Sequence, residues 1–437
     1  MEPNEKLETK VMKLRALLIS ILMTGATMQV ALSQDYDAEA RKLAEQPEIR
    51  AAFDAILELE PRTRDDHIAL TEIPAPPFQE ERRAKRYSEM LQAAGSVEVE
   101  IDDAGNVVAR RRGTKGERVV ALAAHIDTVF PEGTDVTVRI DGNKFTAPGI
   151  GDDTRGLIVV LTALRAMNRA SIETEADLLF IGTVGEEGLG DLRGAKHLFR
   201  DDGPNIDSWI AVDGGGLDRV VHQGIGSIRY RVTFKGPGGH SWGAFGLANP
   251  AHALARAVHT FDEEASSYVA KGPRTSYNIG RIGGGTSVNS IPFETWLEVD
   301  MRSVSPEQLT GIDQLFRNAV TKAVDEQNKI RRNGDPVTAD LEMVGNRPSG
   351  AIDPSTPIVQ RAMATTRFFG KEPSLGTGST DSNVPIARGI PAVTIGRGGE
   401  GDGAHSLREW WADVDGYLAI QRALLLAVAE AGLTTNR

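Results

Sequence analysis

Four short, continuously apolar segments constrain the fold of this chain more than any other feature. A loop rich in glycine or acidic residues follows each of them, and the segments are RVVALAAHI (118–126), ADLLFIGTV (176–184), SWIAVD (208–213) and PAVTIG (391–396). Parallel strands that are covered on both faces show no alternation of apolar and polar residues, so we expect four buried strands. The segment GLIVVLTALRAMNR (156–169) has the length and periodicity of a helix. Strands alternating with helices predict an α/β fold with a mixed, mainly parallel sheet and helices on both faces.

A region in the middle of the chain has a different pattern. Its expected order is strand, helix, strand, strand, helix and strand, at 227–236, 249–266, 276–284, 294–303, 306–327 and 338–344. The strands alternate apolar and polar residues, which is typical of a sheet covered on one face. We therefore expect an inserted α+β (βαββαβ) domain at 222–347, which divides a catalytic domain into residues 34–221 and 348–437. Residues 36–95 have helical periodicity, interrupted by the extended segment IPAPP (73–77).

The N-terminal residues have the layout of a secretory signal. Lys10, Lys13 and Arg15 precede an apolar stretch that ends in a small-x-small pattern at Ala31–Ser33. We expect residues 1–33 to be a signal peptide, cleaved before Gln34, with the mature protein periplasmic or secreted and without a membrane segment. The alternative is an uncleaved membrane anchor, for which Thr24–Gln29 is a weak composition.

Composition limits the chemistry that the chain can perform. The formal net charge is −12, which argues against a nucleic-acid partner because phosphate binding needs clustered Lys and Arg. The chain has no cysteine. Disulfides, thiolate metal ligands and a cysteine nucleophile are therefore excluded, and any metal must be bound by His, Asp and Glu.

Such residues follow the expected strands. The loops after them carry His125 and Asp127, Glu186 and Glu187, Asp213, and His405, and the turn GIGDD adds Asp152 and Asp153 before the helix. Each alone fits a helix cap, a turn or a solvated surface. Ligands of open α/β sheets bind beyond the carboxyl ends of the strands, so we expect these side chains to converge. Two histidines with several carboxylates suit two divalent ions, with zinc favoured and manganese or cobalt as alternatives, and the absence of sulfur argues against a structural zinc.

The motifs HIDT, GDD, EE, DGG and AHS, together with GPGGHSW in the inserted region, carry a resemblance to a known family. In order and spacing they resemble the M20 metallopeptidases, with their tripeptidase T, carboxypeptidase G2-like and aminoacylase branches. The likeness extends over nearly the whole expected mature chain. It implies a dinuclear metal-dependent hydrolase of amide bonds that acts as a homodimer.

The resemblance also implies roles for individual residues. His125 and Asp213 would bind one metal, and Glu187 and His405 the other. Asp152 would bridge the two ions, and its peptide bond to Asp153 would be strained or cis. Asp127 would accept the second imidazole N–H of His125, and Glu186 would be the general base on the attacking water.

Three candidates lie in the inserted region. By resemblance His240 would help to bind the oxyanion of the tetrahedral intermediate, reaching the active site of the partner subunit, although on local grounds it fits a turn cap equally well. Asn289 and Arg302 match positions that contact the substrate carboxylate, and Arg suits this role because its guanidinium binds a carboxylate through two hydrogen bonds. Arg302 also fits an ordinary surface position on a strand.

Three functional hypotheses follow. The first is a secreted exopeptidase that trims short peptides in the manner of an aminopeptidase or tripeptidase. The second is an amidohydrolase that removes the acyl group of an N-acyl amino acid, or a carboxypeptidase. The third is an inactive metal-binding module, which the presence of every ligand and of Glu186 disfavours.

Overall fold

The four predicted buried strands lie next to one another in a single sheet. The computed structural model describes residues 34–434, and within this range nine strands form one sheet, in the order β1-β2-β6-β3-β7-β17-β8-β15 with β16 paired to β8. β6 (Asp177–Thr183) and β7 (Ser208–Val212) flank β3 (Val119–His125) in parallel, and β17 (Ala392–Ile395) is parallel to β7. Every residue of these four strands is buried. The predicted mixed α/β class is confirmed.

The two sides of this sheet contain antiparallel pairs. β1 (Glu98–Ile101) pairs with β2 (Val107–Arg111), which runs antiparallel to β6. On the other side β8 (Arg219–Gly224) runs antiparallel to β17 and to β15 (Gly350–Ala351), and parallel to β16 (Ser374–Gly378). The start of β8 therefore lies at the same edge of the sheet as the end of β17.

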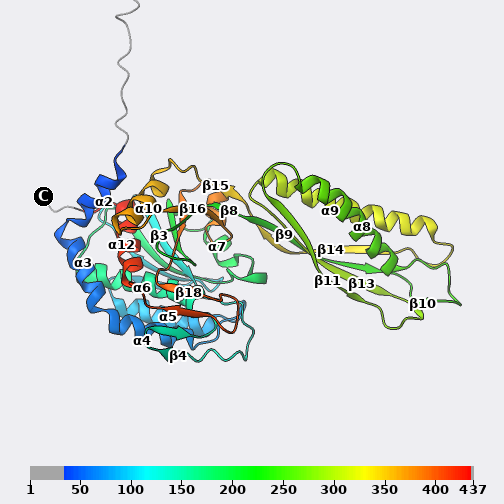
Figure 1. The fold of residues 1–437 in the computed structure, drawn as a ribbon, viewed down its shortest axis with the longest axis horizontal. Helices are drawn as coiled ribbons and strands as arrows, with labels where there is room; N and C mark the ends of the chain where they lie inside the picture. The colour runs from blue at the N-terminus through cyan, green and yellow to red at the C-terminus, as the bar shows by residue number, and fades with distance from the viewer. Residues whose placement is uncertain (1–33, 435–437) are drawn as a thin grey trace, which may run out of the picture. The chain divides into compact units, whose positions relative to one another are not determined.

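Helices pack against this sheet and against one another. α6 (Gly156–Arg169) coincides with the predicted helix and contacts β3 and α12 (Tyr417–Ala431). Figure 1 shows α6, α10 and α12 beside the strands of the large sheet. The remaining helices of this part are α2 (Tyr36–Ala44), α3 (Pro47–Glu58), α4 (Glu60–Thr71), α5 (Glu81–Ala94), α7 (Arg193–Leu198), α10 (Pro357–Phe368) and α11 (Asn383–Ala387). The segment IPAPP is non-helical between α4 and α5, as predicted.

The inserted region forms a second sheet, in the order β11-β13-β9-β14, and all its pairings are antiparallel. In Figure 1 two long helices, α8 and α9, lie along these strands. The elements are β9 (Gly226–Lys235), α8 (Pro250–Val269), β11 (Thr275–Gly284), β13 (Glu294–Ser303), α9 (Pro306–Ile330) and β14 (Thr338–Arg347). This is the predicted βαββαβ order. We call residues 226–347 the inserted domain; its first strand begins four residues after the expected boundary, because β8 continues in the large sheet to Gly224.

The alternation of the inserted strands results from burial on one face. In β13 every second residue is buried, so Leu297, Val299 and Met301 contribute to a core that also contains Phe261 of α8 and Phe316 of α9. This core is separate from the apolar cluster of the large sheet.

Short strands complete the described structure. β4 and β5 form a small sheet with β18 and β19, and β10 pairs with β12; their bounds are Arg139–Asp141, Lys144–Thr146, Glu400–Asp402, Trp410–Ala412, Gly239–His240 and Ser290–Ile291. By its contacts the chain divides into residues 1–36 and 37–437, and the sheets belong to the second unit. The expected signal peptide, 1–33, lies outside the described residues. Within the described part, no helix combines the length and apolar character needed to cross a membrane.

Candidate active site

The ends of neighbouring strands place the predicted ligands together. β3 ends at His125, β6 is followed by Glu186 and Glu187, and β7 is followed by Asp213. Since β6, β3 and β7 are parallel neighbours, these loops leave the sheet at one edge. His405 follows β18, with a φ of 64°. A positive φ is uncommon for a residue other than glycine and is often associated with a functional constraint.

The donor atoms form overlapping groups that share Asp152. The ligand atoms of His125, Asp152 and Asp213 lie within 4.8 Å of one another, and so do those of Asp152, Glu187 and His405. Asp152 Oδ1 is 3.1 Å from His125 Nε2, and Asp152 Oδ2 is 3.3 Å from His405 Nε2. His405 Nε2 is also 2.8 Å from Glu187 Oε1. The two oxygens of Asp152 thus face different histidines, which is the arrangement that a bridging carboxylate requires.

The Asp152 turn is held in place by Glu409, which the AHS motif precedes. Glu409 Oε2 accepts a hydrogen bond from the backbone N–H of Gly149 at 2.7 Å, and Oε1 accepts from Gly151 at 2.9 Å and Asp152 at 2.8 Å. Glu409 is almost fully buried. The Asp152–Asp153 peptide bond is cis, as the resemblance implied.

Replacing Glu409 by alanine should weaken both the fold and metal binding. Three backbone N–H groups would lose their acceptor, and an unsatisfied buried donor costs about 1–3 kcal/mol. We expect the free energy of unfolding to fall by about 3 kcal/mol, and zinc affinity to fall about 10- to 100-fold because Asp152 loses its support. Urea unfolding and zinc titration measure both. Glu400→Ala, at an exposed position on β18, is the control; unchanged zinc affinity in Glu409→Ala would contradict this role.

Asp127 contacts His125 as expected, but through its backbone oxygen. The Nδ1 atom of His125 contacts the backbone oxygen of Asp127 at 2.9 Å, whereas the carboxylate Oδ1 is 3.7 Å away. The carboxylate instead accepts hydrogen bonds from the backbone N–H groups of Glu186 at 2.9 Å and Glu187 at 2.8 Å. The expected contact to the imidazole is therefore made by the main chain of Asp127, because its side chain orients the Glu186–Glu187 loop.

Burial and crowding of charge shift the titration of the site. Burial raises the pKa of Glu186 well above its usual range and also raises the pKa of Asp213. Hydrogen bonds with Asp152 and Glu187 raise the pKa of His405 to about 10. Divalent cations would offset the repulsion among these carboxylates. The donors are all nitrogen or oxygen, and they converge on a shared carboxylate, so the residues fit a pair of divalent ions.

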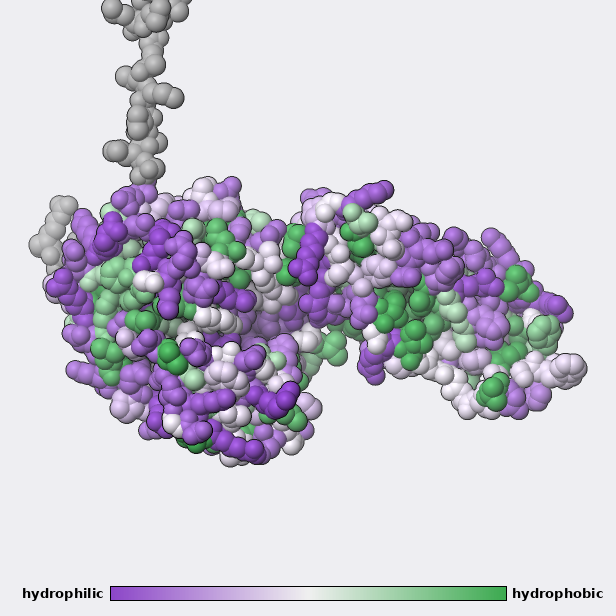
Figure 2. Space-filling model, in the orientation of Figure 1, coloured by the Kyte–Doolittle hydropathy of each residue, from purple (hydrophilic) through white to green (hydrophobic). Residues whose placement is uncertain are grey.

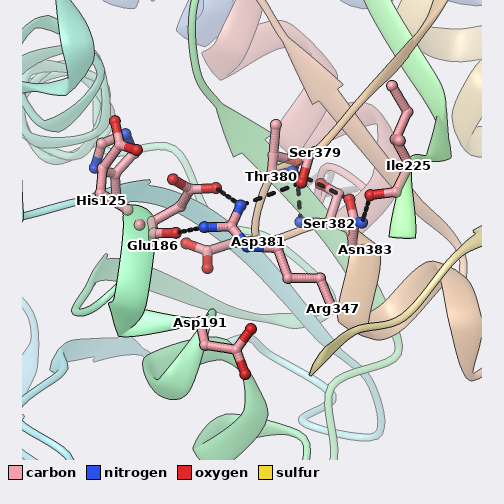
Figure 3. Close-up of polar contacts among 12 residues, drawn as sticks. His125, Glu186, Asp191, Ile225, Arg347, Ser379, Thr380, Asp381, Ser382 and Asn383 are labelled. Carbon is pink, nitrogen blue, oxygen red and sulfur yellow. Dashed lines mark hydrogen bonds and ion pairs between the residues drawn. The ribbon is translucent and has the colours of Figure 1, made fainter. Parts of the chain in front are cut away.

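Arg347 contacts Glu186, a contact that no sequence motif predicted. Its Nη1 lies 3.3 Å from Glu186 Oε1 and 3.1 Å from Ser379 Oγ, and its Nη2 donates a hydrogen bond to the backbone oxygen of Glu186. Figure 3 shows the guanidinium between Glu186 and Ser379. Arg347 is the last residue of β14, so it connects the inserted domain to the Glu186 loop. No local pattern around Arg347 indicated this contact, which joins residues 161 positions apart.

A cleft of about 610 Å³ is lined by four of the five candidate metal ligands, all except His125, and part of its wall comes from the inserted domain. Arg302 lines it beside Arg229, and Asp300 joins the two arginines, with 2.8 Å to Arg229 Nε and 2.7 Å to Arg302 Nε. Arg219 and Arg397 of the catalytic domain also line the cleft. Arg397 follows β17 by two residues, so the position of the strand end could have revealed it.

His240 and Asn289 lie together but do not line this cleft. Ser241 N donates a hydrogen bond to Asn289 O at 2.9 Å, next to the β10–β12 pair. Both side chains are exposed. His240 Nδ1 accepts from the backbone N–H of Trp242 at 3.2 Å and of Gly243 at 3.3 Å, which is the local turn contact that the sequence also allowed. Within this chain, therefore, Arg302 lines the same cleft as the candidate metal ligands, whereas His240 and Asn289 lie outside it.

Known proteins resemble this chain in sequence and in fold. Peptidase family M20/M25/M40 matches residues 121–430. Carboxypeptidase G2 of Pseudomonas sp. (strain RS-16) is 23% identical over 431 residues, 94% of this chain and 96% of that protein. The uncharacterized protein YqjE of Bacillus subtilis is 25% identical over 309 residues, 68% of this chain and 77% of its own. The crystal structure of aminopeptidase PepT from Bacillus cereus superimposes with a TM-score of 0.67 at 22% identity, covering 85% of this chain and 98% of PepT.

Proposed function

This chain belongs to peptidase family M20/M25/M40, and from that premise we propose that it is a dinuclear metal-dependent exopeptidase that hydrolyses the amide bond of short peptides. The observation that carries the proposal is the pair of donor groups sharing Asp152, with Glu186 in the same cleft and outside both groups. The donor set supports zinc as the metal, with manganese and cobalt as alternatives.

The proposed mechanism assigns a separate task to each residue. His125, Asp152, Asp213, Glu187 and His405 would hold two divalent ions, which when bound polarise the scissile carbonyl and acidify a water molecule. Glu186 takes the proton of the attacking water on its carboxylate and transfers it to the leaving nitrogen. The contact with Arg347 orients the Glu186 carboxylate.

Substrate anchoring follows from the charges of the cleft. Arg302 lines the cleft with its guanidinium part-exposed, so we assign it the free carboxylate of the substrate. This anchor serves an N-acyl amino acid as well as a peptide. Deacylation of N-acyl amino acids, or carboxypeptidase activity, is therefore the second candidate, and the match to carboxypeptidase G2 over 94% of this chain favours keeping it.

Product analysis by mass spectrometry distinguishes these activities. The protein is incubated with dipeptides, tripeptides and N-acyl amino acids, each with and without a chelator. Chelator-sensitive release of the N-terminal residue supports an aminopeptidase, release of the C-terminal residue a carboxypeptidase, and cleavage of acylated substrates alone a deacylase. If nothing is cleaved after zinc, manganese or cobalt is restored, the inactive-module hypothesis replaces this proposal.

We further propose that the protein works as a homodimer in which His240 and Asn289 act in the partner's cleft. Their exposed position outside the cleft of their own protomer supports this arrangement. Large apolar side chains near them are also exposed, namely Trp242 (88%), Phe245 (67%), Val288 (103%) and Phe293 (59%). Figure 2 shows hydrophobic surface on the inserted domain. A second copy would cover such surface.

Mixed dimers provide the test. Glu186→Ala and His240→Ala homodimers should each be nearly inactive, because one lacks the base and the other an oxyanion donor. A heterodimer of the two variants, purified through two different tags, contains one cleft with both native residues if His240 acts across the interface. We expect about half of the wild-type kcat, from the symmetry of the dimer. An inactive heterodimer, or a monomer in light scattering, would contradict the proposal.

Export of the protein is a separate proposal, supported by the Lys10–Ser33 pattern alone. N-terminal sequencing of the protein recovered from the producing cell's periplasm or medium should begin at Gln34. Recovery of an intact N-terminus in the membrane fraction would favour the anchor instead.

A further inference from the structure

Two arginines of the catalytic domain meet at the edge of the large sheet that carries the metal-ligand cluster. β17 ends at Ile395, and Arg397 follows it by two residues; β8 begins at Arg219 and runs antiparallel to β17, with Ile395 opposite Val220. The end of one strand and the start of its antiparallel neighbour must lie side by side. The topology therefore places Arg219 and Arg397 together, next to the loop that follows Asp213.

The glycine loop after Asp213 brings the two guanidinium groups close together. A Cβ atom placed on Gly214 would lie 3.5 Å from Arg397 Nη1 and 3.8 Å from Arg219 Nη1. A Cβ on Gly151, beside the bridging Asp152, would lie 2.7 Å from Arg397 Nη2. A Cβ at Gly151 would therefore collide with Arg397, whereas the distances at Gly214 are ordinary contacts and show that both guanidinium groups lie beside this residue. Arg397 is 7% exposed, and both arginines line the cleft.

In the described part of the chain, neither guanidinium forms a direct hydrogen bond or ion pair, although Asp213 attracts both of them, and Asp152, Asp153 and Glu409 attract Arg397, over longer distances. Among residues 34–434, no side chain or backbone group forms a hydrogen bond or an ion pair with the side chain of Arg219 or Arg397. The Nε of Arg219 is buried without a partner. On the inserted domain, by contrast, Arg229 and Arg302 share the carboxylate of Asp300. A guanidinium that is shielded from water and has no hydrogen-bond acceptor loses hydration without a hydrogen bond in return, so an anion that accepts from both arginines would stabilise this pair.

The charge of the whole cleft favours the same kind of ligand. Its lining contains five arginines and five carboxylates, namely Arg219, Arg229, Arg302, Arg347, Arg397, Asp152, Glu186, Glu187, Asp213 and Asp402. The arginines thus equal the carboxylates in number before any metal binds. With two divalent ions bound, the lining carries an excess of positive charge, which attracts anions.

We propose that Arg219 and Arg397 form a second carboxylate-binding site in the cleft, so that the enzyme prefers substrates with two carboxylates. Arg302 binds one of them, and the Arg219–Arg397 pair binds the other, the side chain of an aspartate or glutamate in a short peptide or the acid group of an acylated acidic residue. This inference rests on the proposed function, because it names the substrate class of that cleft.

Matched substrates test the preference. The two members of each pair differ only in carrying aspartate or asparagine. In two pairs of short peptides this residue lies on one or the other side of the scissile bond. The third pair is N-acetyl-aspartate and N-acetyl-asparagine. Charged hydrogen bonds of this kind lead us to expect a kcat/KM about 10- to 100-fold higher for the aspartate member of at least one pair. Arg397→Gln and, independently, Arg219→Gln should reduce that ratio to below about 3. Equal rates for both members in the wild type, or an unchanged ratio in both variants, would overturn the proposal.

A binding measurement separates this inference from the hydrolytic activity. Zinc-loaded Glu186→Ala protein, which should bind substrates without cleaving them, is titrated with the same pairs by calorimetry. The aspartate ligand should bind about 10- to 100-fold more tightly, and Arg397→Gln or Arg219→Gln in this background should remove the difference. If no substrate is cleaved by the wild type, the proposed function fails, while this binding difference still decides for or against the carboxylate site.

Two controls separate direct binding of a substrate carboxylate from a general effect of positive charge. Arg86→Gln, on the exposed side of α5, removes one positive charge far from the cleft and should leave the ratio unchanged. If the arginines only balance the charge of the metal ligands, the variants will change zinc affinity and will change kcat/KM equally for both members of a substrate pair. That result contradicts the proposal. A third outcome is that added bicarbonate or phosphate stimulates cleavage of the asparagine substrates, but only when Arg219 and Arg397 are present. This result would show that a free anion occupies the site, and it would overturn the assignment of the site to a substrate carboxylate.

Discussion

Glu186→Ala should bind two zinc ions per chain normally and lower kcat by about 10²- to 10⁴-fold, the contribution expected of a general base. The Glu186 side chain is buried in the cleft, it lies in neither donor group that shares Asp152, and its backbone N–H is held by Asp127. Removing its carboxylate therefore leaves the ligands in place and takes away only the proton acceptor. Turnover of the best substrate found by product analysis, with metal content measured on the same sample, tests this expectation.

The same experiment addresses a rival role for Glu186. His125, Glu186 and Glu187 also offer donors within 4.8 Å of one another, so Glu186 could instead bind a metal. Zinc content reduced together with kcat would assign Glu186 to the ligands, and activity within tenfold of wild type would exclude it as the base. Glu186→Gln preserves the volume and an oxygen for Arg347 but cannot accept a proton, so its kcat should fall as far. Glu89→Ala, exposed on α5, controls for the loss of one negative charge.

Asp152→Asn should remove both metal ions, whereas single substitutions of the other ligands should affect mainly one. The carboxylate of Asp152 presents one oxygen to His125 and the other to His405. An amide has a single neutral oxygen, so it cannot neutralise or bridge two cations. We expect zinc affinity to fall by more than about 100-fold at both sites, because even indirect supports of metal ligands contribute 10- to 100-fold, and we expect activity to fall with it.

Calorimetric titration with zinc measures this loss of affinity, and it also detects the protons that are released when zinc binds. Because the pKa of His405 is raised to about 10 without metal, this imidazole is protonated at pH 7 and must lose its proton to bind zinc. Wild-type zinc affinity should therefore increase as the pH rises from 6 toward 9, with a heat that depends on the buffer. Asp141→Asn, at an exposed position on β4, is the control. Retention of two zinc ions in Asp152→Asn would show that another residue bridges them.

Much of the site was predictable because it follows from local patterns. Continuous apolar runs mark strands buried on both faces, and the residues directly after them must lie at one edge of a parallel sheet. This rule is sufficient to locate His125, Glu187 and Asp213 from the sequence. The same rule applies to Arg397, which follows β17. Arg397 was not predicted as a site residue because a positively charged side chain does not bind a metal ion.

Other contacts depend on which segments meet, and local patterns carry no information about that. Arg347 is 161 positions from Glu186, and Glu409 is 257 positions from Asp152. Asp127 was expected to accept from His125, and it does so through its backbone oxygen, while its carboxylate accepts from the Glu186 and Glu187 main chain.

By itself, then, the sequence determined the α/β class, the inserted βαββαβ unit and the residues that could bind metals, because these depend on short-range periodicity and on residue chemistry. The folded chain was needed to show how the oxygens of Asp152 are oriented, that Arg219 and Arg397 meet without direct hydrogen bonds, and that His240 and Asn289 lie outside the cleft of this chain. These features result from the packing of segments that are distant in the chain. That packing decides which polar side chains are removed from water and which hydrogen-bond partners they then have.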